Sequence, residues 1–270
     1  VSINSIISVD RVASSLANRI AVVMLGLMLP AVTPATHVGA QTPGTDTTTR
    51  RLRVDMSRLR GSVLAYQTTI ERDASTTILG TRTLSVATTM YVGSPSWLIL
   101  ETRTGDGISA ADSLFLGFSD FRPVHWSSPL GDARLSMEFR GDTAFGAMSV
   151  PGGRRSIVAS IPAGSLINAA MLETVLRLLP LQTAWEDSGT VLTVSANANS
   201  VLPARLSVIG EDRVRVPAGT FDCWVVAVRA DQARGLYWVT KQDPIVVRST
   251  LDIPSLGGAQ LVSALTRIGR

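Results

Sequence analysis

Few side chains in this sequence are of the kinds that carry out covalent catalysis. The 270 residues include one Cys, one Lys and two His. Nucleophilic hydrolysis needs an activated Ser or Cys, yet the sequence contains neither a Gly-x-Ser-x-Gly turn nor a Ser-x-x-Lys pair. Cys223 lies in an apolar run with no Lys or His beside it, so we interpret it as a buried structural residue. We therefore expect no catalytic residue and no enzymatic activity.

Metal and phosphate sites are not indicated either. A His-Glu-x-x-His motif is absent, and Asp106, Asp112 and Asp120 are spaced too irregularly for a calcium-binding loop. The stretch Gly152–Arg155 lacks the Gly-Lys-Ser/Thr ending of a phosphate-binding loop and reads as a hairpin turn. His125 has no identifiable nucleophile to activate, which favours a structural role. We expect no metal ion and no cofactor.

Carboxylates leave one catalytic alternative open. Glu186–Asp187 and Glu211–Asp212 are adjacent pairs, and neighbours on a strand point to opposite faces. Neither pair would converge on one substrate. Carboxylates that only folding brings together could still act as a glycosidase pair, so a carboxylate-based hydrolase is the least favoured of our alternatives.

Tryptophan is the other residue type that suggests a site. Large aromatic side chains can line a cavity for an apolar ligand, but they are also common core residues. Both interpretations stay open from the sequence. The candidates for a cavity lining are Trp97, Trp126, Trp185 and Trp238.

The elements that must position these residues are mostly β-strands. Short runs rich in Val, Thr, Ile and Leu alternate with Gly, Pro and Asp from Gly61 onward. In Trp97–Arg103, for example, Glu101 and Arg103 share one parity with Trp97 and Ile99. The expected strands are 61–71, 78–92, 96–104, 112–118, 122–128, 133–140, 144–150, 154–160, 181–187, 190–198, 204–216, 220–230, 234–241, 244–253 and 258–268.

One segment breaks this pattern. Residues 165–179 carry apolar side chains at helical spacing, with Ser165 as a candidate N-cap and Pro180 as the stop. This predicts one amphipathic helix. Short connections favour antiparallel pairing, because parallel strands need long crossovers. The fold class is therefore mainly β: a curved antiparallel sheet or incomplete barrel with one helix at about 165–179.

The first 40 residues are typical of an export signal. Two arginines precede the apolar run Ile20–Leu29, which is too short to cross a bilayer. Val38 and Ala40 occupy the −3 and −1 positions of a cleavage site after Ala40; an uncleaved anchor is the alternative. No Cys stands beside the cleavage point to receive a lipid. We expect a signal peptide over 1–40 and a periplasmic or secreted protein.

The remaining chain divides into an arm and one domain. Residues 41–59 are rich in Thr and Arg and predict a flexible N-terminal arm. Five arginines between Arg50 and Arg60 could contact anionic headgroups or phosphates, or could simply be solvated. Residues 60–270 are expected to form a single β-rich half-barrel. Without residues 1–40, 23 basic residues face 20 acidic ones, and this near balance argues against a nucleic-acid partner.

A specific pattern lies in the last third of the chain. Gly210–Trp224 contains the hairpin sequence Val-Pro-Ala-Gly-Thr-Phe, followed by Leu236–Val239 and Ile245–Arg248. These segments resemble exported bacterial proteins of the domain of unknown function 3108 family, over most of residues 60–268. The resemblance implies a curved sheet wrapped around a helix, similar to periplasmic lipoprotein-carrier half-barrels, and it brings no catalytic residues. The hairpin motif comprises Val216, Pro217, Ala218, Gly219, Thr220 and Phe221.

These observations lead to two functional hypotheses ahead of the hydrolase. The first is a non-enzymatic envelope protein whose half-barrel binds an apolar, lipid-like ligand, with the helix as a lid. The second is a structural or assembly module that binds another envelope protein through an exposed sheet edge. We expect no transmembrane span in the mature chain.

Overall fold

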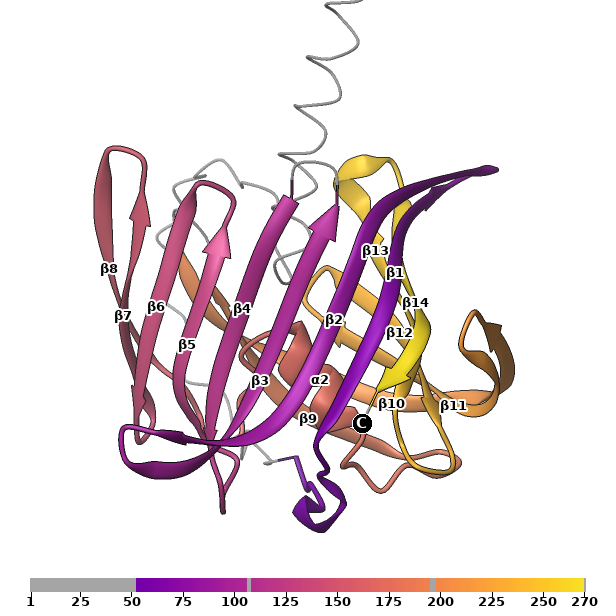
Figure 1. Ribbon diagram of the computed structural model, residues 1–270, viewed down its shortest axis with the longest axis horizontal. Coiled ribbons are helices and arrows are strands. Elements are labelled where there is room, and N and C mark those ends of the chain that lie inside the picture. The colour runs from indigo at the N-terminus through magenta and orange to yellow at the C-terminus, as the bar shows by residue number, and fades with distance from the viewer. Residues whose placement is uncertain (1–51, 106–107, 195–197, 270) are drawn as a thin grey trace, which may run out of the picture.

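All strands formed by the described residues join one antiparallel sheet. The computed structural model describes residues 52–105, 108–194 and 198–269. The sheet has fourteen strands in the order β8-β7-β6-β5-β4-β3-β2-β1-β14-β13-β12-β11-β10-β9 (Figure 1). The strands are β1 (Ser62–Arg72), β2 (Ser75–Tyr91), β3 (Ser94–Gly105), β4 (Ile108–Gly117), β5 (Pro123–Leu130), β6 (Ala133–Arg140), β7 (Thr143–Val150), β8 (Gly153–Ser160), β9 (Glu186–Val194), β10 (Asn199–Val216), β11 (Gly219–Ala230), β12 (Ala233–Thr240), β13 (Val246–Ile253) and β14 (Ala259–Gly269).

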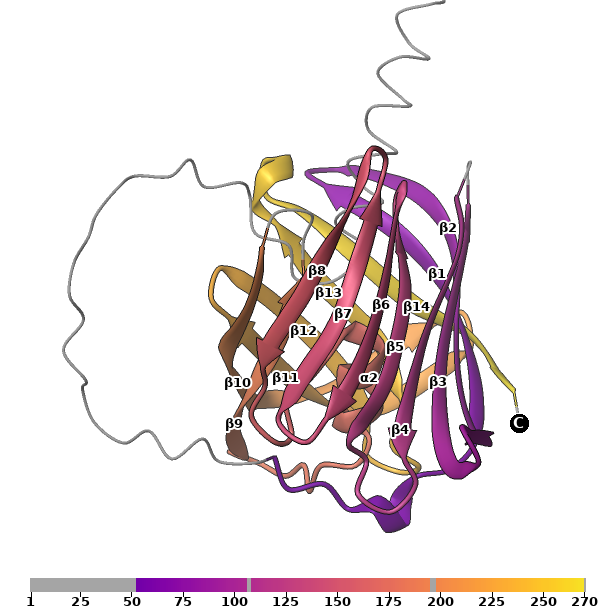
Figure 2. The ribbon, with the colours of Figure 1, turned by 90° about the vertical axis from the view of Figure 1, so that its left-hand side faces the viewer.

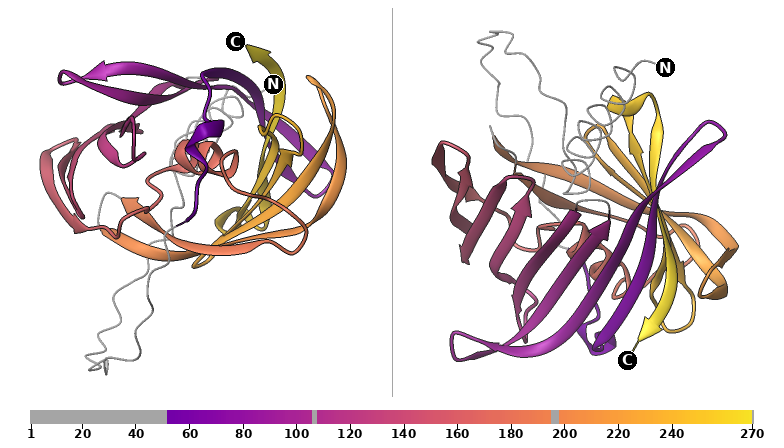
Figure 3. Two further views of the ribbon diagram at one scale, coloured as in Figure 1. Left: turned by 90° about the horizontal axis from the view of Figure 1, so that it is seen from below. Right: turned by 45° about the horizontal axis from the view of Figure 1, so that its top comes forward.

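This order confirms the predicted fold class. The sheet curls around helix α2 (Ala169–Leu176) without closing into a barrel, and α2 is the one α-helix among the described residues (Figures 1 and 3). The outermost strands are β8 and β9. Asn199, at the start of β10, connects these two strands. It pairs with Val194 of β9, and its Oδ1 accepts a hydrogen bond from Arg155 of β8 at 3.2 Å.

The two ends of the described chain hold the sheet together at its centre. β1–β8 and β9–β14 each form a meander, and the two meanders join where β1 pairs with β14. Figure 2 shows these halves facing each other across the concave side. The Tyr66 hydroxyl of β1 donates to the Val246 carbonyl of β13 at 2.8 Å, which links the halves a second time.

Alternation along the strands separates a buried concave face from an exposed convex face. In β6 every second residue is buried, and in β3 the alternating residues Trp97, Ile99, Glu101 and Arg103 are buried, together with Ser96 at the start of the strand. The shared parity predicted for these four residues is confirmed. Two charged residues therefore lie inside the curve with the apolar core, which is unusual unless they are paired.

Helix α2 is shorter and more deeply buried than expected. Its N-cap is Asn168, whose side chain accepts a hydrogen bond from the Met171 amide at 2.8 Å. Ser165, the predicted cap, instead donates to the Pro162 carbonyl, and Leu166 pairs with Val191 of β9. Residues 170–176 are buried on every side, because the sheet surrounds the helix. The expectation of an amphipathic lid over 165–179 is corrected to a buried helix of eight residues.

Most expected strands lie within a few residues of the observed ones, with one exception. The strand predicted for 181–187 does not form over 181–185: these residues are irregular, with a turn at 183–184, and Ala184 has a positive φ of 59°. β9 begins only at Glu186. Apolar residues alone suggested a strand there, and the backbone conformation at Ala184 interrupts it.

The segment before β1 packs against the fold. A 3-10 turn, η2 (Met56–Arg58), follows the Asp55 amide, which donates to the Leu178 carbonyl at 2.9 Å. Leu52 and Leu59 are buried. Residues 52–59 thus cross one end of the half-barrel beside α2 and differ from the flexible arm expected there (Figure 3). The predicted signal peptide, 1–40, and residues 41–51 of the predicted arm lie outside the described residues.

Within the described parts of the chain, no helix is long and apolar enough to span a membrane.

Candidate functional site

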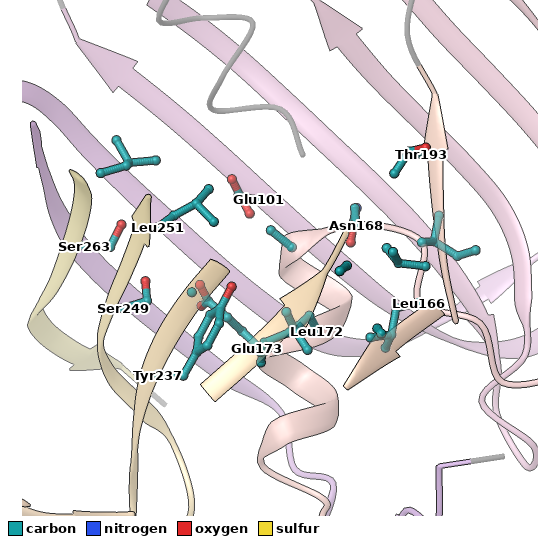
Figure 4. A pocket seen from close by; sticks show the side chains of 18 of the residues that line it. Glu101, Leu166, Asn168, Leu172, Glu173, Thr193, Tyr237, Ser249, Leu251 and Ser263 are labelled. Atoms are coloured by element: carbon teal, nitrogen blue, oxygen red, sulfur yellow. The ribbon is translucent and has the colours of Figure 1, made fainter. Parts of the chain in front are cut away.

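A cavity of about 100 Å³ lies on the concave side, between α2 and both halves of the sheet. Glu101 from β3, Glu173 from α2 and Tyr237 from β12 surround the same space (Figure 4). More than half of the lining residues are apolar. The aliphatic part of the wall includes Leu166, Leu172, Val191, Leu192, Val228 and Leu251.

Two neighbouring rows of residues place charges on one side of this cavity. Strand pairing sets Tyr66, Arg82 and Arg103 side by side across β1, β2 and β3. The next row sets Glu101 of β3 opposite Asp112 of β4. Each arginine therefore has a carboxylate as its diagonal neighbour, the arrangement in which long side chains reach one another.

Ion pairs connect these rows with the helix. Arg82 Nη2 lies 2.9 Å from Glu173 Oε2, and Arg82 Nη1 lies 3.6 Å from Glu101 Oε2. Arg103 Nε lies 2.9 Å from Glu101 Oε1, and Arg103 Nη2 lies 3.8 Å from Asp112 Oδ2. We call Arg82, Glu101, Arg103, Asp112 and Glu173 the charged cluster. Less than a tenth of each side chain is exposed, so screening by water is weak and each charge depends on its partners.

Asp112 is the most completely hydrogen-bonded carboxylate of the cluster. It accepts from Trp126 Nε1 at 2.9 Å, from Ser128 Oγ at 2.7 Å and from Asn168 Nδ2 at 3.0 Å. Burial, followed by the charge of Glu101, raises the pKa of Asp112 to about 6. Because Asn168 also caps α2, Asp112 ties the helix N-terminus to β4 and β5.

Glu173 ties the middle of the same helix to the sheet. Burial raises its pKa, while the neighbouring Arg82 opposes this rise. Arg82 also lies over the ring of Tyr66, with its guanidinium carbon 4.4 Å from the ring centroid. The Nε of Arg82 is buried and has no hydrogen-bond partner within the described structure.

Hydroxyl groups form a second polar part of the lining. Tyr237, Ser249, Ser263 and Thr68 all line the cavity. Thr68 Oγ1 and Ser263 Oγ lie 3.5 Å apart, a weak contact. Tyr237 is 7% exposed, and its hydroxyl receives or donates no hydrogen bond among the described side chains and backbone groups. Polar groups of this kind can fix the orientation of a small molecule.

The four tryptophans predicted to line a cavity are separated by the fold. Trp126 lines it and bonds Asp112. Trp97 stacks on Phe118 with ring centroids 5.6 Å apart, away from that space. Trp238 donates to Asp212 at 2.9 Å from a half-buried position. Trp185 packs at the edge of the core.

The hairpin Val216–Phe221 forms the connection between β10 and β11. Val216 pairs with Gly219, so Pro217 and Ala218 make a two-residue turn. Gly219 has a φ of 143°, which favours glycine. The Ala218 amide donates to the Leu265 carbonyl of β14 at 3.0 Å. Backbone geometry thus explains the sequence motif. The hairpin residues do not line the cavity.

His125 and Cys223 lie elsewhere. His125 Nδ1 is 2.8 Å from Glu138 Oε1 on the convex face, and its ring stacks on Tyr91. Cys223 is buried, and burial together with Asp212 and Asp222 raises its thiol pKa to about 12. No group of three or more His, Cys, Asp or Glu is placed to hold a metal ion in residues 52–105, 108–194 and 198–269.

Sequence patterns alone did not single out the charged cluster. Strand parity put Glu101 and Arg103 on one face, but their partners come from distant positions. Arg82 and Glu173 are separated by 91 positions, and no local spacing joins them. The one signal that could have marked Glu173 is that it is the single carboxylate in the predicted helical segment 165–179.

The comparisons with known proteins bear on the family. A family model described as "Protein of unknown function (DUF3108)" matches residues 65–260. The chain belongs to this family. The predicted resemblance is thereby confirmed. The DUF3108 match includes the charged cluster and the hairpin Val216–Phe221.

This DUF3108 protein was also compared with curated proteins and with solved structures. Among curated proteins, none matches the chain. A similar solved structure is that of a candidate exported protein with a YmcC-like fold from Bacteroides fragilis, at 11% sequence identity and a TM-score of 0.33. The alignment covers 78% of this chain and 97% of that one. The family description names no ligand, so function rests on the geometry of the site.

Proposed function

We propose that this DUF3108 protein is an exported, non-enzymatic binding protein that holds an apolar, lipid-like molecule on its concave side. The cavity between α2 and the sheet is the observation that carries the proposal. It combines aliphatic walls with a few converging polar groups, the composition of small-molecule sites in proteins.

The size of the cavity limits what enters it. Helix α2 and the core fill most of the concave face, and about 100 Å³ is well below the roughly 300 Å³ of a small drug-sized pocket. A whole acyl chain would not fit. The cavity would accept one end of an amphipathic molecule, with the rest of the molecule lying outside it.

The charged cluster supports binding over catalysis. Its carboxylates are paired with Arg82 and Arg103, and Asp112 already accepts three hydrogen bonds. A general acid or base must be able to exchange a proton with its substrate. Carboxylates held in this way are better suited to fixing α2 on the sheet.

Titration with primary alcohols of increasing length tests the proposal. Lipid-free protein would be titrated by calorimetry with butan-1-ol through dodecan-1-ol. We expect affinity to rise about fourfold per methylene while the chain enters the cavity, because each buried methylene contributes about 0.8 kcal/mol. The rise should level off once the cavity is full. Absence of binding by every alcohol would contradict the proposal.

Variants that fill the cavity test whether the ligand occupies it, and the same substitution outside the lining is the control. Ala204→Leu and Ala230→Leu add side-chain volume at lining positions and should weaken alcohol binding. Ala159→Leu makes the same change at a buried position on β8 outside the lining and should leave binding unchanged. Equal losses in all three variants would mean that core overpacking, and not occupancy of the cavity, reduced affinity.

Partner binding at a sheet edge is the second candidate. β8 is an outermost strand whose outer side forms no ladder with another described strand, although Asn199 of β10 donates to the Val158 carbonyl at 3.5 Å. The Val158 residue is 65% exposed. The β9 edge, by contrast, is covered by Leu166. A photo-crosslinking residue at Val158 should capture one defined envelope protein in cells if this function holds, and the same residue at Ile78 should not.

A further inference from the structure

We propose that the end of the ligand that enters the cavity is an uncharged hydrogen-bonding group, such as a hydroxyl, and that Tyr237 pairs with it. This inference rests on the proposed binding function. It adds the chemistry of the group recognised and excludes phosphate, carboxylate and ammonium ends.

Tyr237 is the group that points to a ligand. It is more than nine-tenths buried, it lines the cavity, and its hydroxyl has no hydrogen-bond partner among the described residues (Figure 4). Tyr66 is just as buried, but its hydroxyl donates to the Val246 carbonyl. The Tyr237 hydroxyl therefore keeps one donor and its acceptor lone pairs for a ligand, and a ligand hydroxyl can pair with either.

Two neutral hydroxyl side chains lie in the same part of the lining as Tyr237, although the charges of Glu173, Arg82 and Glu101 also act on Tyr237. Ser249 and Ser263, from β13 and β14, contribute hydroxyls to the same wall. A hydroxyl can both donate and accept, so it matches a wall of hydroxyls in either direction. Burial, followed by the charge of Glu173, raises the pKa of Tyr237 above its ordinary value, which keeps the phenol neutral.

An anionic end is disfavoured because the arginines are already engaged. Arg82 pairs with Glu101 and Glu173, and Arg103 with Glu101 and Asp112. The remaining Nε of Arg82 has almost no accessible surface. A phosphate or carboxylate in the cavity would face Glu101 and Glu173 without a free cation to compensate, which is costly in a buried site.

A cationic end is disfavoured because the carboxylates near the cavity are already matched by arginines. Glu101, Asp112 and Glu173 face Arg82 and Arg103, and a third arginine, Arg177, lies close enough to Glu173 to lower its pKa. Arg177 itself is held by the Pro244 carbonyl and by Ser62. The three acids are thus balanced by three bases, and an ammonium would enter without a carboxylate to pair with it.

Four ligands with one chain length test the inference. Lipid-free protein would be titrated with octan-1-ol, octanoate, octyl phosphate and octylammonium at pH 7.5. We expect octan-1-ol to bind roughly tenfold or more tightly than each charged ligand. If a charged ligand binds as tightly as the alcohol, the inference is overturned while the proposed binding function stands. If none of the four binds, the proposed function fails.

A pair of variants tests the role of Tyr237. Tyr237→Phe removes only the hydroxyl and should lower octan-1-ol affinity about fivefold, leaving the weak octanoate affinity unchanged. Tyr91→Phe makes the same change on the convex face, where the hydroxyl contacts Glu138, and should bind as the wild type does. Unfolding temperatures would establish that both variants are folded. Wild-type alcohol affinity in Tyr237→Phe would overturn the assignment.

Discussion

The arginines of the charged cluster lie where most proteins place apolar side chains. Buried ion pairs often contribute little net stability, because removing both charges from water costs several kcal/mol. Removing one partner is different, since it leaves the other charge buried and unpaired. At the residue scale, the cluster is therefore best understood as a specific connection between α2 and the sheet.

Replacing Arg82 tests how strongly the stability of the fold depends on its pairing with Glu173. Arg82→Met keeps an apolar side chain over Tyr66 but leaves Glu173 without its 2.9 Å partner. We expect the free energy of unfolding to fall by about 3–5 kcal/mol in urea titrations. Arg154→Met, at an exposed position on β8, should change it by less than about 0.5 kcal/mol. Similar small losses in both variants would show that the pairing with Glu173 is unimportant.

Asp112 should make stability depend on pH in an unusual direction. Its pKa is about 6 in the folded protein against 3.8 ordinarily, so between these values the folded state holds a proton that the unfolded state has released. The contribution of Asp112 to the free energy of unfolding is therefore present in full below about pH 4 and is lost as the pH rises through 6. The loss amounts to about 3 kcal/mol. Glu173, whose pKa is also raised, acts with the same sign.

Asp112→Asn isolates this effect. The variant cannot titrate at position 112, so the decline in unfolding free energy between pH 4.5 and 7.5 should be smaller than in the wild type. Urea denaturation at four pH values in this range would measure both slopes. Parallel slopes would mean that Asp112 is ionised in the folded protein throughout the range.

At the scale of elements, α2 depends on its N-cap, Asn168, more than on its length. Eight residues are too few for a helix that is stable alone, so its caps and its surroundings must maintain it. Asn168 accepts from the Met171 amide and donates to Asp112 in the same conformation. One side chain thus fixes both the start of the helix and its position on the sheet.

Changing the chemistry of this cap separates its two roles. Asn168→Ser keeps an oxygen for the Met171 amide, and we expect a loss of about 1 kcal/mol from the missing bond to Asp112. Asn168→Asp is also a good cap but places a second carboxylate against Asp112, so it should be clearly less stable than Asn168→Ser at pH 7.5. The gap between the two variants should narrow at pH 5. An Asp variant as stable as the Ser variant at pH 7.5 would count against contact with Asp112.

Local patterns predicted the elements well and the site poorly. Alternation identified strands such as β6, predicted and observed at 133–140, because side chains on a strand alternate between two faces whatever lies beyond it. The helix over 165–179 was predicted too long and too exposed, since apolar spacing does not tell how many faces the fold will cover. The pairing of Arg82 with Glu173 and the free hydroxyl of Tyr237 depend on which strands meet across the concave side.

At the scale of the whole molecule, both ends of the described chain hold the half-barrel together. β1 and β14 join the two meanders, and residues 52–59 cross one end of the half-barrel. Leu59 anchors that crossing, being 3% exposed. The half-barrel therefore depends on a segment whose composition suggested a flexible arm.

Substitution of Leu59 tests this dependence. Leu59→Ala should lower the free energy of unfolding by about 2–4 kcal/mol through lost burial and the cavity left behind. Arg53→Ala, at an exposed position of the same segment, should have almost no effect. Thermal and urea unfolding would measure both changes. A neutral Leu59→Ala would indicate that the segment is dispensable for the fold.

We expect the space between α2 and β12 to receive the uncharged end of an apolar molecule. A crystal structure with 8-bromooctan-1-ol tests it most directly, because bromine marks the tail and the oxygen marks the head. We predict the ligand oxygen within hydrogen-bond distance of the Tyr237 hydroxyl and the bromine farther out along the aliphatic wall. Only water in the cavity, or bromine bound solely on the convex face, would mean that the cavity does not bind the uncharged end of such a molecule.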